Sequence, residues 1–440
     1  MSDYMFMLES HLSTDQFQVV SEMQKIASSM GVSLYLTGGA MRDMLGGFPV
    51  RGLGFTTEGS ALKLAKLAEQ KHGCKVVETD DHLKLANLKF PNGITCEVRM
   101  ARAEKFAKSG ARPQISPATI HEDLRSRDFT INAIGLSLNH ASLGLLIDPT
   151  NGVGDIERKE LRAIHNYSFY DEPARMLRLI RFKIRLGYGI DERTKLQYEN
   201  AREAEMLTKL TPEALLLELR GMANEVNIHD LMQALDEEKL TVLYSASLIG
   251  AKLNLAGLSK LQKARQTPPF GWDLRMNGLA LLLKVLLEKL SSKESAQFFK
   301  SVDLPKSDIA AIGKLEAGAK KLERDLKSPK LQKASLLYQL ITKSPGEQVL
   351  YLLVYSAQRI VPDRIRNFFQ KHLPASSEVT DELVAATGVA PGTPKFHKVK
   401  EEMILTRLDA RPKKVEPPPE PPPPPPMSGF ARSSSLRARS

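Results

Sequence analysis

Hydrophobic and polar positions follow two different patterns along the first 150 residues. Residues 32–36 form a short apolar run that predicts a buried strand, and this run ends at a Gly-Gly pair. Residues 60–72 instead carry alanine and leucine at helical spacing, and Gly73 follows them as a helix stop. Strands and helices are therefore expected to mix in this part of the chain.

A hairpin is predicted around Asn92-Gly93, a dipeptide typical of two-residue turns between antiparallel strands. In the run that follows, apolar side chains at every second position take one face of the expected strand. Thr95, Glu97 and Arg99 take the opposite face. The hairpin therefore places charged side chains on one side of a sheet.

The pattern changes after about residue 165, where the strand signals stop and helical periodicity continues to about residue 405. Breaks fall near residues 267–269, 327–329 and 344–346, where proline, serine and glycine interrupt the helices. The sequence shows no fixed-period repeat. The predicted fold class is α+β, with an α/β head followed by an all-α remainder.

Residues 411–440 differ in composition from everything before them, being rich in proline and then in serine and arginine. Such a segment cannot bury a hydrophobic core, so we predict that it is disordered. It is either a passive tail or an aid to RNA binding through Arg432, Arg437 and Arg439.

The charge of the chain favours a polyanionic partner. The 440 residues carry a formal net charge of +11, and each phosphate contacted by lysine or arginine releases a counterion. Solubility alone is the other explanation for this surplus. The N-terminus lacks the apolar core of a signal peptide, and the most apolar run, residues 279–290, is too short to span a membrane. We therefore expect a cytoplasmic protein with no membrane partner.

The two cysteines, Cys74 and Cys96, predict neither a zinc site nor a disulfide framework. His72 lies near Cys74, but no further cysteine or histidine nearby completes a metal-ligand pattern. Both residues are expected to be reduced and to act as small apolar side chains.

The first motif with chemical meaning is the turn at residues 36–43, Leu-Thr-Gly-Gly-Ala-Met-Arg-Asp. A strand runs into Gly38 and Gly39 and then into a helical pattern. Glycine lets the backbone approach a phosphate closely, and the free N–H groups at a helix start attract anions. Taken alone, the pair is more typical of a plain turn between a strand and a helix.

A second motif spans residues 122–133, where charged residues adjoin an apolar run that contains Asn132. Arg127 has the chemistry to bind a triphosphate, and Asp128 has the chemistry to bind a ribose hydroxyl. The simpler interpretation is a solvated helix start that Asp128 caps.

The third motif, residues 171–182, is a predicted helix with Pro173 in its first turn. Arg175, Arg178 and Arg181 recur at every third residue and share a broad face. A carboxylate beside a guanidinium offers acceptors and donors that can pair with the edge of a nucleobase. A ladder of salt bridges within the helix is the alternative.

Together these motifs resemble the class II tRNA nucleotidyltransferase and bacterial poly(A) polymerase family, in the family's order and at about its spacing. The resemblance covers roughly residues 20–410, including a linking segment at residues 147–152 and a C-terminal segment at residues 381–392. It implies that the following residues bind a nucleotide: Gly38, Gly39, Arg42, Asp43, Arg127, Asp128, Asn132, Asp171, Glu172, Arg175, Arg178 and Arg181. Ser126 replaces a leading arginine of the family's second motif, and the acids Asp171 and Glu172 stand in swapped order.

The match fails where the family holds its catalytic metals. The family carries two aspartates one residue apart on a strand, which with a third carboxylate hold two Mg²⁺ ions. Here Gly52 and Gly54 occupy the two aspartate positions, and Glu97 matches the third carboxylate as the surviving catalytic residue. One carboxylate cannot hold two divalent cations, so Mg²⁺ binding is expected to be weak or absent. Asp43 and Glu58 are the nearby carboxylates that would have to substitute.

The resemblance implies a head, a neck, a body and a tail, and these names are kept below. The predicted boundaries are residues 1–150 for a nucleotidyltransferase-type head, 151–225 for the neck, 226–325 for the body and 326–410 for the tail. The expected partners are the acceptor arm of tRNA or another RNA 3′ end, and ATP or CTP. Two hypotheses follow: a template-independent enzyme that adds CMP and AMP, or AMP alone, to RNA, and a binding protein of this descent without catalysis.

Overall fold

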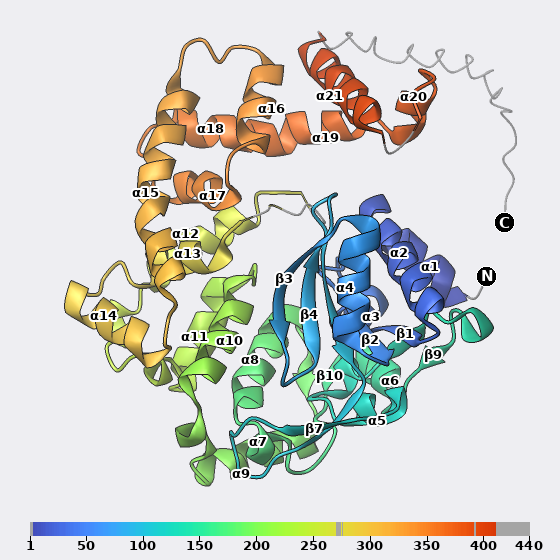
Figure 1. Cartoon of the computed structure of the whole chain (residues 1–440). Coiled ribbons are helices and arrows are strands. Elements are labelled where there is room, and N and C mark those ends of the chain that lie inside the picture. Colours follow the sequence, from blue (N-terminus) through green and yellow to red (C-terminus); the bar gives the residue numbers. More distant parts are fainter. Residues whose placement is uncertain (1–2, 270–273, 275, 391–392, 411–440) are drawn as a thin grey trace, which may run out of the picture.

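The computed structural model of the chain describes residues 3–269, 274, 276–390 and 393–410 (Figure 1). The predicted disorder of residues 411–440 therefore lies outside the described residues, as do residues 391–392 of the C-terminal segment. No described helix is both long enough and apolar enough to cross a membrane.

The head contains two N-terminal helices, a sheet and its covering helices. Its elements are α1 (Asp3–His11), α2 (Thr14–Met30), β1 (Ser33–Thr37), α3 (Gly39–Leu45), β2 (Leu53–Glu58), α4 (Ala61–His72), β3 (Lys75–Asp80), β4 (Leu85–Lys89), β5 (Thr95–Met100), β6 (Arg102–Lys105), β7 (Gln114–Pro117), α5 (Ile120–Arg125), η1 (Thr130–Asn132), β8 (Gly135–Ser137), η2 (His140–Ser142) and β9 (Leu146–Ile147).

Seven strands form the main sheet in the order β3-β4-β5-β2-β1-β8-β9, and β6 and β7 pair as a separate hairpin. Within the main sheet β2 and β5 run parallel, whereas the other neighbouring pairs are antiparallel. A parallel pair needs a crossover. Here the chain from β2 passes through α4 and the β3–β4 hairpin before it enters β5.

One face of the sheet is covered by α2 and α4 and forms the main core of the head (Figure 1). Leu36, Phe55 and Val98, from three adjacent strands, are all fully buried in it. The predicted strand at residues 32–36, the helix at residues 60–72 and the hairpin at Asn92-Gly93 are confirmed. Alternation then sends Glu97 to the opposite face, as predicted.

The opposite face of the sheet carries polar side chains and is covered in part by α5. Ile120 and Leu124 of this helix pack against Tyr35 of β1. Beyond α5 the face presents the pair Thr37 and Thr56, whose hydroxyls lie 2.9 Å apart. This polar half of the face is where the predicted nucleotide-binding motifs meet.

The neck follows the head with a helix-rich segment and one small sheet. Its elements are α6 (Gly152–Arg158), β10 (Glu160–Leu161), α7 (Ser168–Asp171), α8 (Ala174–Leu186), β11 (Gly189–Ile190), α9 (Glu192–Glu203), η3 (Met206–Lys209) and α10 (Pro212–Ala223). The prediction that strands stop at about residue 165 is wrong at β11, which pairs with β10 in parallel. Two residues are too few to show a period in the sequence.

The body and tail are helical throughout their described residues. Their elements are α11 (Ile228–Glu237), η4 (Thr241–Leu243), η5 (Gly250–Lys252), α12 (Leu255–Arg265), α13 (Gly278–Leu286), α14 (Ser292–Ser301), α15 (Lys306–Lys327), α16 (Ala334–Thr342), α17 (Gly346–Tyr355), α18 (Ile360–Asn367), the π-helical turn η6 (Phe368–His372), α19 (Leu373–Ser377), α20 (Asp381–Ala385) and α21 (Pro394–Asp409). The helices continue from the neck in a curve that brings α20 and α21 above the head in Figure 1. The predicted fold class, an α/β head followed by helices, is confirmed.

Candidate nucleotide site between head and neck

The register of two parallel strands fixes the geometry of the expected metal site. Gly54 of β2 is the direct partner of Glu97 of β5, and Gly52 lies just before β2. The surviving carboxylate therefore stands beside a position that has no side chain. The strand framework of the site is present, and two of the three expected ligands are not.

The two carboxylates considered as substitute ligands are both engaged elsewhere. Asp43 is buried, and its two oxygens lie 2.7 Å from Arg42 Nη2 and 2.7 Å from Arg185 Nη2. Glu58 lies about 13 Å beyond Gly54 along the same strand. It accepts the Ile120 N–H at 2.7 Å and the Tyr35 hydroxyl at 3.3 Å.

These donors do not fit a pair of magnesium ions. Mg²⁺ demands near-octahedral oxygen coordination and is usually anchored by carboxylates. Glu97 is the one carboxylate left among the three expected positions, and the same strand face carries the cation Arg99. Among the residues that the structure describes, no group of three His, Cys, Asp or Glu side chains is placed to hold a metal ion.

The Gly-Gly turn allows a guanidinium to lie against the backbone. Gly38 has a φ of 70°, and a Cβ at this position would come within 3.0 Å of Arg127 Nη1. Both the left-handed backbone and the close approach favour glycine here. The helix that follows, α3, has seven residues and starts at Gly39. The first two motifs are thus in direct contact, although about 90 residues separate them in sequence.

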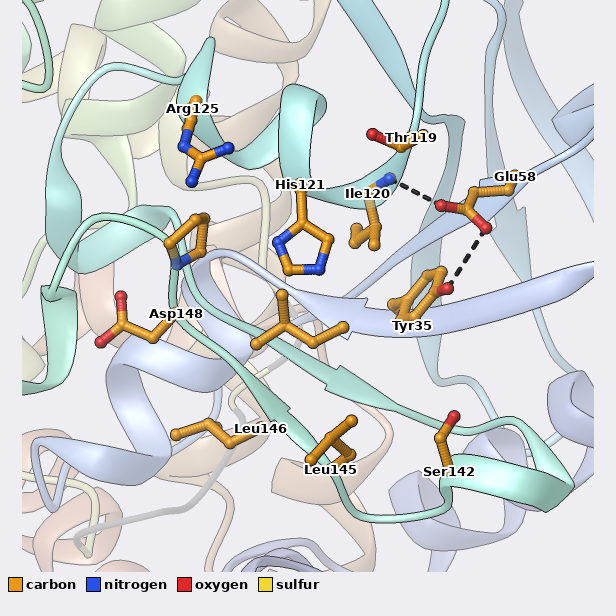
Figure 2. Close-up of a pocket in the computed structure, with 12 residues that line it drawn as sticks. Tyr35, Glu58, Thr119, Ile120, His121, Arg125, Ser142, Leu145, Leu146 and Asp148 are labelled. Carbon is orange, nitrogen blue, oxygen red and sulfur yellow. Dashed lines mark hydrogen bonds between the residues drawn. The ribbon is translucent and has the colours of Figure 1, made fainter.

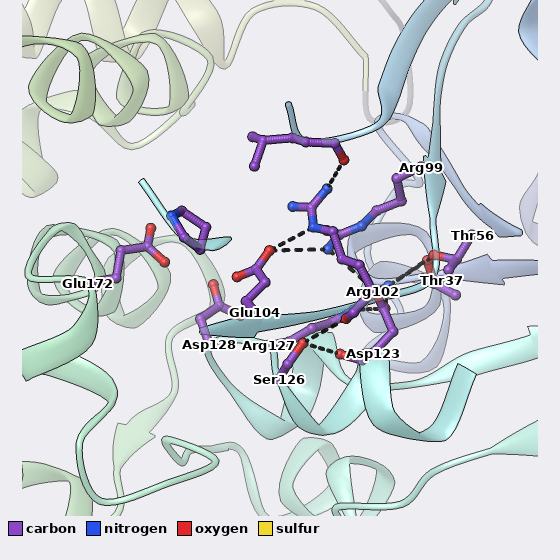
Figure 3. A network of polar contacts seen from close by, with 12 residues as sticks. Thr37, Thr56, Arg99, Arg102, Glu104, Asp123, Ser126, Arg127, Asp128 and Glu172 are labelled. Carbon is purple, nitrogen blue, oxygen red and sulfur yellow. Dashed lines mark hydrogen bonds and ion pairs between the residues drawn. The ribbon is translucent and has the colours of Figure 1, made fainter. Parts of the chain in front are cut away.

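Arg127 uses its donors within the protein (Figure 3). Nε and Nη2 donate to Asp123 Oδ2 at 3.1 and 2.7 Å, and Nη1 donates to the Asn132 carbonyl at 3.1 Å. Nη2 also lies 3.1 Å from Thr37 Oγ1 and 3.0 Å from Thr56 Oγ1. In this arrangement Arg127 fixes α5 to the ends of β1 and β2, and any triphosphate contact has to share these donors.

Asp128 joins the head motif to the neck helix α8. Its Oδ1 accepts Asn132 Nδ2 at 2.9 Å, and its Oδ2 lies 3.0 Å from Arg178 Nη1. Burial by itself raises the pKa of this carboxyl, but the guanidinium groups of Arg178 and Arg175 outweigh burial and lower the pKa to about 2. Asp128 is therefore a carboxylate at physiological pH.

In the third motif, Glu172 and Arg175 are the carboxylate and guanidinium that lie side by side. Glu172 Oε2 lies 2.9 Å from Arg175 Nε, and Oε1 lies 3.1 Å from Arg178 Nη2. Arg175 is 2% exposed and also donates to the Ser168 hydroxyl. Asp171, which the sequence groups with these two, instead directs its carboxylate toward His165 Nδ1 at 4.0 Å.

Six of the predicted site residues belong to a closed ring of ion pairs and hydrogen bonds that joins head to neck. In order around the ring the members are Arg42, Asp43, Arg185, Glu225, Arg181, Glu218, Arg178, Asp128 and Asn132. The Phe182 ring lies between two of them, 4.8 Å from the Arg42 guanidinium carbon and 4.8 Å from that of Arg181. We refer to these nine residues as the head–neck ring.

Three members of the head–neck ring, Arg185, Glu218 and Glu225, were not identified from the sequence. Arg185 continues the arginine series of α8 one turn after Arg181, which is a weak signal. The two glutamates lie on α10 and directly after it, in a segment of ordinary amphipathic pattern. Only the packing of α10 against α8 shows that both carboxylates are buried beside arginines.

One hollow in the head lies beside α5. It has a volume of about 530 Å³ and is lined by residues that include Tyr35, Glu58, His121 and Asp148 (Figure 2). Figure 2 shows the Glu58 carboxylate held between Tyr35 and the start of α5. None of the predicted nucleotide-binding residues lines this hollow.

Comparison with known proteins places the chain beside tRNA-processing enzymes. Residues 34–162 match the family described as the poly A polymerase head domain. The A-adding tRNA nucleotidyltransferase of Halalkalibacterium halodurans is 31% identical over 277 residues, which are 62% of this chain and 64% of that protein. The A-adding tRNA nucleotidyltransferase of Geobacter sulfurreducens is 32% identical over 215 residues, 48% of this chain and 24% of that protein. The chain thus spans less than two thirds of the length of these relatives.

Solved structures share the fold over most of the chain. A CCA-adding enzyme in an apo form has a TM-score of 0.54 at 24% identity, covering 94% of this chain and 96% of that chain. The Thermotoga maritima CCA-adding enzyme complexed with tRNA has a TM-score of 0.52 at 24% identity, with the same coverage. CCA-adding enzyme complexes with ATP and with CTP are also similar, each with a TM-score of 0.52.

Proposed function

Because the chain belongs to the class II tRNA nucleotidyltransferase family, we propose that it binds nucleoside triphosphates and RNA 3′ ends but has lost, or almost lost, the transfer reaction. The observation that carries this proposal is the register of β2 and β5. Glu97 stands beside Gly54 in a regular pair of strands, so the scaffold of the site persists without two of its ligands. The proposal is thus that the site differs from that of an active enzyme in its side chains and not in its fold.

The loss of both aspartates removes what this reaction needs most. Transfer of a nucleotidyl group depends on positioning and on neutralising charge at the phosphates, and bound magnesium supplies both in the family. Glu97 alone has no partner carboxylate with which to fix an ion beside the RNA hydroxyl. The alternative is an active enzyme in which Asp43 or Glu58 replaces the missing ligands. Against it, Asp43 is already paired with two arginines, and Glu58 lies far along the strand and accepts the Ile120 N–H.

Nucleotide binding is supported by the pair that remains at the neck. Glu172 is 29% exposed in its side chain, so its carboxylate reaches solvent while Arg175 and Arg178 hold it in place. A fixed carboxylate and a guanidinium present acceptors and donors for the edge of a base. ATP and CTP are the proposed nucleotides.

RNA binding is supported by the charge of the chain and by the curved helical part. The proposed partner is the acceptor arm of tRNA or another RNA 3′ end, which would contact the body and tail. The net charge of +11 matches a phosphate backbone. Relatives with this fold include the CCA-adding enzyme complexed with tRNA.

The test is an extension assay that measures catalysis and binding in the same preparation. Purified protein is incubated with Mg²⁺ or Mn²⁺, labelled ATP or CTP, and tRNA that lacks its 3′ end. We expect tRNA to be retained on a filter and no labelled product above background. Extension at ordinary enzymatic rates would show that the chain is an active transferase, and absence of RNA binding at micromolar protein in low salt would refute the binding role.

A further inference from the structure

Arg99 occupies the face of the sheet on which the family holds its metals. It follows Glu97 by two residues on β5, about 7 Å along the strand, and it is the direct strand partner of Thr56 on β2. Its side chain is 20% exposed. The face that lacks two carboxylates therefore carries a guanidinium one strand position beyond the surviving one.

The position of this guanidinium is fixed by a buried acid. Asp123 has no exposed side-chain surface, and its Oδ1 lies 3.4 Å from Arg99 Nη2 (Figure 3). Glu104 lies farther away, at 3.9 Å from the same nitrogen. A cation held in this way is oriented before a ligand arrives, which lowers the entropy that binding must overcome.

Arg99 is only one of the partners of the Asp123 carboxylate. Its Oδ2 already accepts two hydrogen bonds from Arg127, at 2.7 and 3.1 Å, and its Oδ1 accepts the Arg102 N–H at 3.2 Å. The Arg99 contact is the longest of the four. Arg99 Nε is buried and has no hydrogen-bond partner among the residues that the structure describes. The contacts with Asp123 and Glu104 are made by Nη2, and a fifth of the side chain stays exposed, which is the part that a ligand can reach.

The charges around Glu97 indicate the class of ligand that this guanidinium fits, which is a polyanion. Three carboxylates beside a triphosphate repel it unless metal ions lie between them. Here Glu97 is the single negative charge of the three positions, and the same face carries the positive charge of Arg99, whose ion-pair partners are Asp123 and Glu104. A polyanion can approach such a site without a cation in between, and arginine binds phosphate oxygens through charge-assisted hydrogen bonds.

We propose that Arg99 supplies to the phosphates of a bound nucleoside triphosphate the positive charge that magnesium supplies in the family, so that this protein binds the nucleotide without a divalent cation. This inference rests on the proposed function, because it requires that the nucleotide binds at all. It adds to that function the residue that binds the phosphates, Arg99, and the expectation that nucleotide binding does not depend on a divalent cation.

The test is a calorimetric titration of the full chain with ATP, in Mg²⁺ and in excess EDTA. We expect the two dissociation constants to agree within about twofold, because no metal takes part in binding. AMP, which lacks the β- and γ-phosphates, should bind more weakly, and inorganic tripolyphosphate should compete with ATP.

The variants Arg99→Gln and Arg99→Lys test the residue. Loss of a charged hydrogen bond should weaken ATP binding by about tenfold or more in Arg99→Gln, while Arg99→Lys retains part of the affinity. Arg112→Gln is the matched control, since Arg112 is 69% exposed and pairs at 2.8 Å with Asp80, which lies on the edge strand β3. The thermal midpoint and RNA binding are measured for each variant.

The outcomes separate the inference from the proposed function. If ATP binds only with Mg²⁺, or binds Arg99→Gln as well as the unmodified protein, the inference is wrong and the proposed function stands. If ATP binds under neither condition, nucleotide binding fails and the inference fails with it. If Arg99→Gln does not fold, the EDTA titration of the unmodified chain and the Arg99→Lys variant still decide.

Discussion

Gly52 and Gly54, which stand where the resemblance leads us to expect aspartate, differ in the room around them. A Cβ at position 52 would meet no atom within 4 Å, whereas a Cβ at position 54 would lie 3.2 Å from the Thr37 carbonyl oxygen. Neither glycine has the left-handed backbone that excludes side chains. Aspartate can therefore be returned to position 52 freely and to position 54 with a shift of a few tenths of an ångström at Thr37.

Restoring both aspartates should restore a metal site. We expect Gly52→Asp and Gly54→Asp together to bind Mn²⁺ and to raise labelled-nucleotide transfer at least about tenfold, because such carboxylates act as a unit. Each single variant should remain at background. Manganese titration followed by electron paramagnetic resonance measures the metal, and the extension assay measures transfer.

A substitution of Arg99 in the double variant serves as a control for the metal-binding experiment. Its guanidinium faces the same side as the restored carboxylates and should reduce their affinity for a cation. Adding Arg99→Thr to the double variant should therefore tighten Mn²⁺ binding further. A double variant that binds neither manganese nor more nucleotide than before would show that the site has changed beyond its two missing ligands.

Asp128 should make the stability of the protein depend on pH in the acid range. Its pKa is about 2 in the folded chain, against an ordinary value of 3.8. Because the folded value is the lower one, this carboxylate stabilises the fold above about pH 4, and the contribution of about 2 kcal/mol is lost as the pH falls toward 2. Urea unfolding of the unmodified chain and of Asp128→Asn, from pH 5 to pH 2.5, measures the difference. Parallel pH profiles for the two proteins would contradict this role.

At the scale of elements, α8 is the helix that connects the nucleotide motifs to the fold. It supplies Arg178, Arg181 and Arg185 to the head–neck ring and places Phe182 between two guanidinium groups. The ladder of salt bridges proposed as an alternative for this helix exists, but it runs between elements and not only along one helix. Residues first assigned to a ligand thus also hold the head against the neck.

The most consequential single carboxylate in this arrangement is Glu218 of α10. It is 2% exposed and receives Arg178 at 2.6 Å and Arg181 at 3.5 Å. Glu218→Ala removes one carboxylate from each of two guanidinium groups, while Arg178 keeps Asp128 and Glu172 and Arg181 keeps Glu225. We therefore expect the free energy of unfolding to fall by about 1.5–3 kcal/mol, the range for hydrogen bonds to charged groups. Chemical denaturation monitored by circular dichroism gives this value.

Glu213, in the first turn of the same helix, is the matched control for Glu218. It is exposed, and its alanine variant should cost less than about 1 kcal/mol through the helix dipole. If both variants lower the free energy of unfolding equally, Glu218 in the head–neck ring stabilises the fold no more than an exposed charge does.

At the scale of the whole molecule, charge and shape together predict how RNA binds. The surplus of +11 is distributed over a chain whose helical part curves around toward the head (Figure 1). We expect tRNA affinity to fall steeply with salt, with a log–log slope of about −3 to −5, because several phosphates release their counterions. Filter-binding titrations between low and moderate salt measure the slope.

The C-terminal arginines provide a comparison within the same chain. If Arg432, Arg437 and Arg439 contact phosphates, changing all three to alanine should make the slope shallower by about 1 to 3. An unchanged slope would assign residues 411–440 to a passive tail. A slope near zero for the unmodified protein would contradict electrostatic binding of RNA altogether.

The sequence by itself determined much of the order of elements, the motifs and the presence of glycine at positions 52 and 54. Period and turn signals are local, so strand β1, helix α4 and the hairpin at Asn92-Gly93 follow from neighbouring residues. Glycine at positions 52 and 54, where the resemblance to the family leads us to expect aspartate, is read directly from the sequence. Strand alternation also assigns Glu97 to a face, since that depends on parity alone.

Only the tertiary structure decided which groups stand together. It placed Glu97 beside Gly54 through a parallel register that a crossover of about 40 residues sets. It placed the carboxylate of Asp171 beside His165 and that of Glu172 beside Arg175, and it engaged Asp43 and Glu58 in contacts with other residues. It also brought Glu218 and Glu225 from ordinary helix positions into the head–neck ring. The physical reason is that an ion pair depends on distance in space, and distance between remote segments is set by packing and not by any local pattern.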